Sequence, residues 1–264
     1  MARKRITQVL FVLSLILSLT LASCQGGGFS LFATETPTPT LTFTPTATFT
    51  PSPTATATAT QTPSPTPLPT GSEVQEQADG SLLFIDYDNK YQLTLPSTWL
   101  PIPISKDDLA ESLDNVAAEN PQFAESVEQF KQLDENVVRL VALNGDPAYF
   151  KNGTATNLNI TTLPDPLMAV MPLSFVTGAM EEAFKQQNVK VLTEGVNTIG
   201  NANGVEVQYI DIEQTVSGIT LKQRVLFFQS ETHLMMITLT TLTEFSEALF
   251  AEAEVMGASI ELLK

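Results

Sequence analysis

The stretch VEVQYIDIEQTVSGITLKQRVLFFQSETHLMMITLTT, residues 205–241, decides the fold class. It contains three runs rich in β-branched and aromatic residues: Val205–Glu213, Ile219–Gln229 and Leu234–Thr241. Turn-forming residues separate the runs, first around Ser217-Gly218 and then at Ser230-Glu231-Thr232. Sequential strands with such short joins pair antiparallel. The stretch therefore predicts an antiparallel meander.

Further strands are expected on the N-terminal side of this meander. They are Leu82–Tyr87, Lys90–Leu95, Val137–Leu143, Ala155–Thr162 and Val189–Ile199. The first two form a hairpin around Asp88-Asn89, and apolar residues alternate with polar ones along the second, which indicates one buried face. A short edge strand is expected at Ala258–Leu263.

Four helices are expected from apolar residues at helical spacing. Their predicted N-caps are Ser105 and Asn120, which open a pair over residues 105–135, then Ser174 and Thr243. The helix after Ser174 has an apolar stripe expected to face the sheet: Phe175, Val176, Ala179, Met180, Ala183 and Phe184. Separate runs of strands and helices predict an α+β fold, a mainly antiparallel β-sheet covered by α-helices.

The N-terminus resembles a secretory signal, with Arg3-Lys4-Arg5 before an uncharged apolar run that ends at Leu21. Small residues then precede Cys24, the only cysteine, and Leu21–Cys24 resembles the lipobox of bacterial lipoproteins. The resemblance implies cleavage between Ser23 and Cys24, removal of residues 1–23, and a diacylglyceryl group on Cys24. Two alternatives stay open. In the first, residues 6–22 stay uncleaved as a membrane helix. In the second, the signal is cleaved from a soluble secreted protein, and Cys24 is an ordinary residue near the cleavage site.

Residues 34–70 are mostly Thr and Pro, with Ser, Ala and a few apolar residues, and nine of the 17 prolines fall there. Proline removes backbone donors, and the stretch has too little apolar surface to offset the cost of ordering the chain. Residues 24–80 are therefore predicted to be a disordered tether, and residues 81–264 a single globular domain. Composition leaves open whether the tether is an O-glycosylated stalk or an unmodified spacer.

Charge narrows the range of partners. Without residues 1–23 the chain has ten basic and 29 acidic residues, a net charge of −19. Nucleic acid is excluded because its phosphates need Lys and Arg contacts. Anionic lipid heads also repel such a domain, so the expected membrane contact is the lipid on Cys24. We expect a monomer.

The sequence offers few groups for catalysis. His233, the only histidine, lies in a polar turn, and no Gly-x-Ser-x-Gly elbow or phosphate-binding loop is present. Asp86-x-Asp88-Asn89 faintly resembles a calcium loop, but Lys90 takes the third ligand position, so a solvated turn is expected. We predict no catalytic residue, no metal and no cofactor.

Four short motifs carry a family resemblance. They are Leu-Pro-x-x-Trp at Leu95–Trp99, Asn-Leu-Asn-Ile at Asn157–Ile160, Gly-x-Glu-Val at Gly204–Val207 and Ala-Ser-Ile at Ala258–Ile260. In this order, residues 82–264 resemble the Mog/PsbP-like fold of small bacterial lipoproteins, including the DcrB and LpqN types. The resemblance implies an α/β/α sandwich. It also implies a mostly non-enzymatic role as an assembly factor or partner-binding module.

Two functions follow as hypotheses. The first is a non-catalytic module on the extracytoplasmic face of a bacterial membrane, which binds a protein or envelope ligand. The alternative is an extracytoplasmic hydrolase that acts on cell-wall or sugar substrates. The expected partner surface combines Trp99 with the acidic helical pair, and its members are Trp99, Asp107, Asp108, Glu111 and Asp114. The negative electrostatic field of these carboxylates would steer a cationic partner toward the surface. Alternatively, the pair is only a soluble lid, and Trp99 closes the end of the core.

Overall fold

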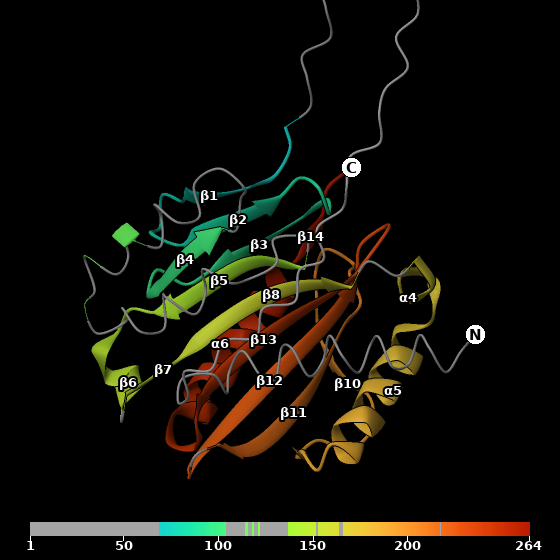
Figure 1. Cartoon of the computed structure of the whole chain (residues 1–264). Coiled ribbons are helices and arrows are strands. Elements are labelled where there is room, and N and C mark those ends of the chain that lie inside the picture. Colours follow the sequence, from blue (N-terminus) through green and yellow to red (C-terminus); the bar gives the residue numbers. More distant parts are fainter. Residues whose placement is uncertain are drawn as a thin grey trace, which may run out of the picture. The chain divides into compact units, whose positions relative to one another are not determined.

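The computed structural model describes residues 69–103, 114, 115, 118, 121, 137–151, 153–163, 166–216 and 218–264. Most of the described strands form one large antiparallel sheet (Figure 1). Its strand order is β10-β11-β12-β13-β8-β5-β4, and β9 also pairs with β11. The strands are β4 (Trp99–Pro103), β5 (Val138–Asn144), β8 (Asn157–Leu163), β9 (Lys190–Val191), β10 (Asn197–Ile199), β11 (Val207–Val216), β12 (Ile219–Gln229) and β13 (Leu234–Leu242).

A smaller antiparallel sheet has the order β1-β2-β3-β14. Its strands are β1 (Ser72–Glu76), β2 (Leu82–Asp86), β3 (Tyr91–Leu95) and β14 (Glu261–Leu262). The remaining described elements are short pieces and helices: η3 (Pro147–Tyr149), β6 (Phe150–Lys151), β7 (Thr154–Ala155), α4 (Pro166–Val170), α5 (Leu173–Gln186), η4 (Thr243–Phe245) and α6 (Ser246–Ser259). The α+β class and the antiparallel sheet are confirmed.

The predicted meander is confirmed as β11-β12-β13, and the Leu82–Leu95 hairpin as β2-β3. The single strand expected at Val189–Ile199 is wrong. Two short strands, β9 and β10, replace it, and both pair with β11. Gly195 lies between them at a φ of 71°, a left-handed conformation that turns the chain.

The tether was expected to reach Gly80, but ordered structure begins before that residue. Ser72–Glu76 form β1, which pairs with β2 along five residues, from Ser72 opposite Asp86 to Glu76 opposite Leu82. Val74 explains the pairing, because its side chain packs against the main core. One apolar residue among polar ones gave too weak an alternation to predict a strand.

The two faces of the large sheet pack against different elements. One face meets the small sheet and α6, and its core cluster includes Phe84, Tyr91, Leu158, Ile237, Leu249 and Met256. The opposite face meets α5, through Leu163, Val176, Met180, Phe184 and Met236. Helices therefore lie on both faces of the sheet (Figure 1). Burial of each such side chain contributes about 1.5–3 kcal/mol.

Two predicted caps are wrong. Helix α5 begins at Leu173 with Pro172 at its N-cap, so Ser174 lies inside the helix. Helix α6 begins at Ser246 after the 3₁₀ turn η4, which contains Thr243. Close packing holds α6 on the sheet, because a Cβ on Gly257 would lie 2.9 Å from Ile199 Cδ1.

The predicted helical pair over residues 105–135 lies almost entirely outside the described residues. Asp114, Asn115 and Ala118 are described and helical. Ser23 and Cys24 also lie outside the described residues. Within the described ranges, every helix is too short or too polar to cross a membrane.

Candidate functional site

Trp99 does not form part of an exposed ledge. Its side chain is only 1% exposed and belongs to the core cluster between the sheets and α6. The indole Nε1 donates a hydrogen bond to Glu252 Oε2 of α6, at 2.9 Å. The alternative interpretation, that Trp99 closes the end of the core, is therefore correct. A buried indole satisfied by its own domain has no face left for a partner.

Of the acidic residues predicted to form the partner surface, only Asp114 is described, and it is exposed. Asp107, Asp108 and Glu111 lie outside the described residues. That part of the predicted surface stays a prediction.

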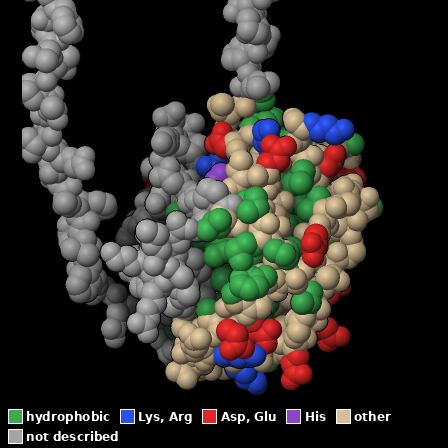
Figure 2. Space-filling model, turned by 90° about the vertical axis from the view of Figure 1, so that its right-hand side faces the viewer, with side chains coloured by type: hydrophobic (Ala, Val, Ile, Leu, Met, Phe, Trp, Pro, Cys, Tyr) green, Lys and Arg blue, Asp and Glu red, His purple; other side chains and the backbone are tan. Residues whose placement is uncertain are grey.

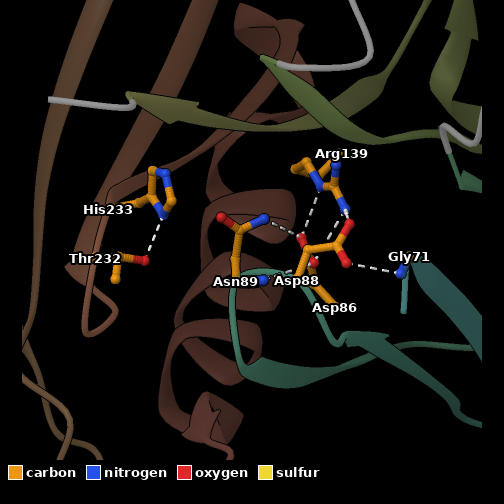
Figure 3. Close-up of polar contacts among 7 residues, drawn as sticks. All are labelled: Gly71, Asp86, Asp88, Asn89, Arg139, Thr232 and His233. Atoms are coloured by element: carbon orange, nitrogen blue, oxygen red, sulfur yellow. Dashed lines mark hydrogen bonds and ion pairs between the residues drawn. The ribbon is translucent and has the colours of Figure 1, made fainter. Parts of the chain in front are cut away.

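A polar cluster instead forms around Arg139 and Asp86 (Figure 3). Asp86 ends β2 and is fully buried. Its carboxylate accepts hydrogen bonds from Arg139 Nε at 2.9 Å and Arg139 Nη2 at 3.2 Å. Arg139 lies at an irregularity in β5, where the register with β8 shifts. Bulges of this kind redirect a side chain, and here the guanidinium reaches from the large sheet to the small one.

The β2-β3 turn supplies the rest of this cluster. Asn89 donates to Asp86 twice, from its backbone N at 3.0 Å and from Nδ2 at 2.8 Å. Asp88 accepts from Arg139 Nη2 at 2.8 Å and from Gly71 N at 2.9 Å. Lys90 completes the turn at a φ of 55°. The solvated turn expected at Asp86–Asn89 is therefore only half right, since Asp88 is partly exposed but Asp86 is buried.

Electrostatics match this geometry. Burial works against the charge of Arg139, but its hydrogen bonds and charge attraction to Asp86 and Asp88 are stronger and raise its pKa. Partial burial tends to raise the pKa of Asp88, yet the Gly71 N–H and the guanidinium lower it on balance. Burial, reinforced by the negative charge of Asp86, raises the pKa of the Tyr91 hydroxyl. All three groups therefore keep their ordinary charge states at neutral pH.

His233 lies in the turn between β12 and β13, beside this cluster (Figure 3). Its Nδ1 is 2.7 Å from the Thr232 hydroxyl, and its backbone is bonded to Ser230. Burial lowers the pKa of His233, the negative charge of Asp86 opposes this, and the positive charge of Arg139 adds to it. A hydroxyl beside an imidazole can form a nucleophile-base pair. In the present case both groups belong to one turn, and Thr232 is exposed.

A second arginine cluster lies on the same face of the large sheet. Arg224 of β12 binds both oxygens of Asp211 at 2.8 Å, and Arg224 Nη1 binds Glu254 of α6 at 2.7 Å. The guanidinium also stacks over the rings of Tyr209 and Phe250, 4.3 and 4.6 Å from their centroids. This cluster joins two strands to α6.

In chemical terms, each cluster pairs one guanidinium with two carboxylates. Among the described residues, no group of three or more His, Cys, Asp and Glu side chains is placed to hold a metal ion. The sequence analysis singled out Asp86, Asp88 and Asn89 but not Arg139, since no local pattern brings residues 53 positions apart together. For Arg224 a signal existed, because the meander's register places it directly opposite Asp211.

No protein-family model matches this chain, and no curated protein matches its sequence. Solved structures do resemble it. Cyanobacterial PsbP from Synechocystis has 10% identity and a TM-score of 0.43, over 69% of this chain and 92% of that one. LpqN, involved in cell envelope biogenesis of Mycobacterium tuberculosis, has 11% identity and a TM-score of 0.38, over 66% and 83%. A Pseudomonas aeruginosa protein of unknown function has 13% identity and a TM-score of 0.32, over 70% and 94%.

Both kinds of protein named from the sequence motifs, PsbP-like proteins and LpqN, are therefore among the similar structures. Every one of these TM-scores is below 0.5 and every identity is 13% or less. Such similarity carries no argument about function, which has to rest on this chain's own residues.

Proposed function

We propose that the protein is a lipid-anchored module on the extracytoplasmic face of a bacterial membrane, which binds a protein or envelope ligand without catalysing a reaction. The lipid is attached at Cys24, and the Thr/Pro-rich tether holds the domain away from the bilayer. Two acyl chains on one cysteine anchor a protein stably. A long Thr/Pro-rich tether lets the domain search for a membrane-bound partner at raised effective concentration.

The observation that carries this proposal is that the two arginine clusters link elements of the fold to one another. Arg139 joins the two sheets and Arg224 joins β11, β12 and α6, with the donor–acceptor distances to their carboxylates between 2.7 and 3.2 Å. A general acid or base must be able to reach a substrate proton. These groups instead pair with one another inside the domain and hold its elements rigidly together. A rigid scaffold lowers the entropic cost of binding a partner.

The test compares binding with turnover in the full chain. Affinity capture from envelope membranes is done with the wild-type protein and with Thr232→Ala and His233→Ala, which remove the hydroxyl–imidazole contact. We expect all three to retain the same saturable partner and to lack turnover of cell-wall and sugar substrates. Hydrolysis that either substitution abolishes would replace the proposal with the extracytoplasmic hydrolase.

Anchoring is tested separately by mass spectrometry of the mature N-terminus. We expect a diacylglyceryl-modified Cys24 in the wild type, and an uncleaved precursor without the lipid in Cys24→Ala. An unmodified N-terminus downstream of Cys24 would remove the lipid anchor from the proposal but leave the binding function standing.

A further inference from the structure

Helix α5 exposes a side chain that the sequence pattern assigns to the core. Phe175 was expected to face the sheet, yet its side chain is 61% exposed. The residues of α5 that do face the sheet are Leu173, Val176, Met180 and Phe184. Phe175 lies on the outer stripe, with Gly178, Ala179 and Glu182, all exposed. The small residues leave the surface beside the phenyl ring open.

Other apolar side chains lie next to it in the chain. Seven large hydrophobic side chains are exposed among the described residues, and three of them, Leu167, Val170 and Phe175, fall within nine positions. Val170 is 76% exposed. Figure 2 views the side of the domain that carries α4 and α5, and hydrophobic side chains gather on this face. We call Leu167, Val170 and Phe175 the apolar ridge. Concentrated apolar exposure of this kind marks interaction surfaces.

The α4–α5 joint beneath the ridge is tied to the sheet. Gln229, at the end of β12, donates from Nε2 to Met168 O at 2.6 Å and to Met171 O at 2.7 Å. Met168 and Met171 are partly buried against the α5 core cluster. The backbone under the ridge is therefore fixed from the sheet side, while Val170 and Phe175 point to solvent. A preorganised surface loses less entropy when it binds.

The negative charge of Glu182, at the far end of the outer stripe, indicates that the partner is basic. Glu182 lies two helical turns beyond Phe175, about 10.5 Å along the axis. Lys185 is shared between Glu181 at 2.7 Å and Glu182 at 3.1 Å, so one positive charge meets two negative ones. Glu182 is 64% exposed, and ion pairs at such exposed positions are weak, so a partner's cation can replace Lys185 at little cost.

Resting on the proposed binding function, we propose that the apolar ridge and Glu182 form the docking surface for an amphipathic basic helix of a partner protein. Its apolar side chains pack on Val170 and Phe175. A Lys or Arg about two turns away pairs with Glu182. Helices recognised in this way present apolar anchors at i, i+3/i+4 and i+7. A bilayer fits less well, because the local charge is negative and interfacial surfaces are rich in Lys and Arg.

The test is site-specific photo-crosslinking in the cells that produce the full chain. A photoreactive phenylalanine analogue replaces Phe175, Val170 or, as the matched control, Val255, a 66% exposed valine on α6. We expect adducts at positions 175 and 170 at least fivefold more abundant than at 255. Mass spectrometry should place them on an apolar segment with Lys or Arg about seven residues away. Glu182→Lys should lower the yield at 175 severalfold, since it turns the attraction into repulsion.

Several outcomes would overturn the inference. The first kind is an adduct with the wrong occupant: a second copy of the chain, lipid, or the apolar segment at residues 29–32 of the same chain. The second kind is a partner segment that has no basic residue. The third is an adduct yield at position 255 equal to that at 175 and 170, or no adduct at all. The proposed function is judged independently by affinity capture. If Phe175→Ser still captures the partner in full, the module binds through another surface and only the ridge is rejected.

Discussion

Arg139 and Arg224 each pair with two carboxylates, but they join different kinds of neighbours. Arg224 lies directly across from Asp211 on the adjacent strand, so the sheet's own register brings the pair together. Arg139 reaches from β5 in the large sheet to Asp86 in the small one. Asp86 has no exposed surface, whereas the Asp211 side chain is 12% exposed and that of Glu254 is 54% exposed. The difference in burial is therefore confined to one carboxylate, Asp86, and the cluster that contains it links elements that no register holds together.

The largest effect is expected from Arg139→Met. This change leaves Asp86 buried without its cation, and breaking a buried pair from one side costs about 3–5 kcal/mol. Urea unfolding followed by circular dichroism measures the loss in free energy of unfolding. Asp86→Asn in the same chain should recover part of it, because the buried charge is then gone. A loss below about 1 kcal/mol would mean that the buried Asp86 carboxylate does not depend on Arg139 to offset its charge.

A smaller effect is expected from Arg224→Met. The methionine keeps contact with the rings of Tyr209 and Phe250, while water can reach Glu254 and part of Asp211. Loss of charged hydrogen bonds with such partial rehydration costs about 2–3 kcal/mol. The same urea series measures it. If Arg224→Met lowers the free energy of unfolding as much as Arg139→Met does, the expected difference between the two clusters is wrong.

This contrast also explains what the sequence could predict. Strands joined by tight turns, such as β2-β3 and β11-β12-β13, follow from local alternation, and so does the register that pairs Arg224 with Asp211. The Arg139–Asp86 contact depends on a bulge in β5 and on how two sheets stack, and neither leaves a local pattern. The lone Val74 gave too little alternation to reveal β1.

The predicted inward face of α5 was wrong at Phe175 and Ala179 for another reason. The helix was expected to begin after a cap at Ser174, so Leu173, its first core residue, was excluded. Val176, Met180, Ala183 and Phe184 do pack on the sheet side as expected, but the stripe was also extended to Phe175 and Ala179, which are exposed. On a helix, adjacent residues are 100° apart, so one position is enough to turn an exposed stripe inward. Because Phe175 was assigned to the buried face, the sequence did not predict the docking surface proposed there.

Acid should weaken the Arg139 cluster at Asp88. The folded-state pKa of Asp88 is lowered from its ordinary value of 3.8, on balance, by the Gly71 N–H and Arg139. The unfolded chain therefore takes up the proton first as the pH falls. The stabilisation from Asp88 is complete above about pH 4 and is lost as the pH drops through the lower folded value. Because the side chain is 45% exposed, the effect stays under about 1 kcal/mol.

The measurement for Asp88 is the melting temperature of the wild type and of Asp88→Asn between pH 6 and pH 2.5. The two curves should converge at the acid end, since protonation and substitution remove the same charge. A constant gap between wild type and Asp88→Asn across the range would show that the carboxylate's charge is not what stabilises the turn.

The smallest effect is expected at His233. This residue lies beside the Arg139 cluster, whereas no histidine lies near the Arg224 cluster. Burial lowers the pKa of His233 from 6.5, with Asp86 opposing and Arg139 adding to the shift. The unfolded chain therefore binds a proton first as the pH falls below about 6.5. Stability is full above that pH and declines as the pH falls toward the folded pKa. His233→Gln should remove this decline between pH 7.5 and pH 5 in the same melting series. If His233→Gln instead steepens the acid decline, the imidazolium is stabilised in the folded state, and Asp86 rather than Arg139 controls the charge of this turn.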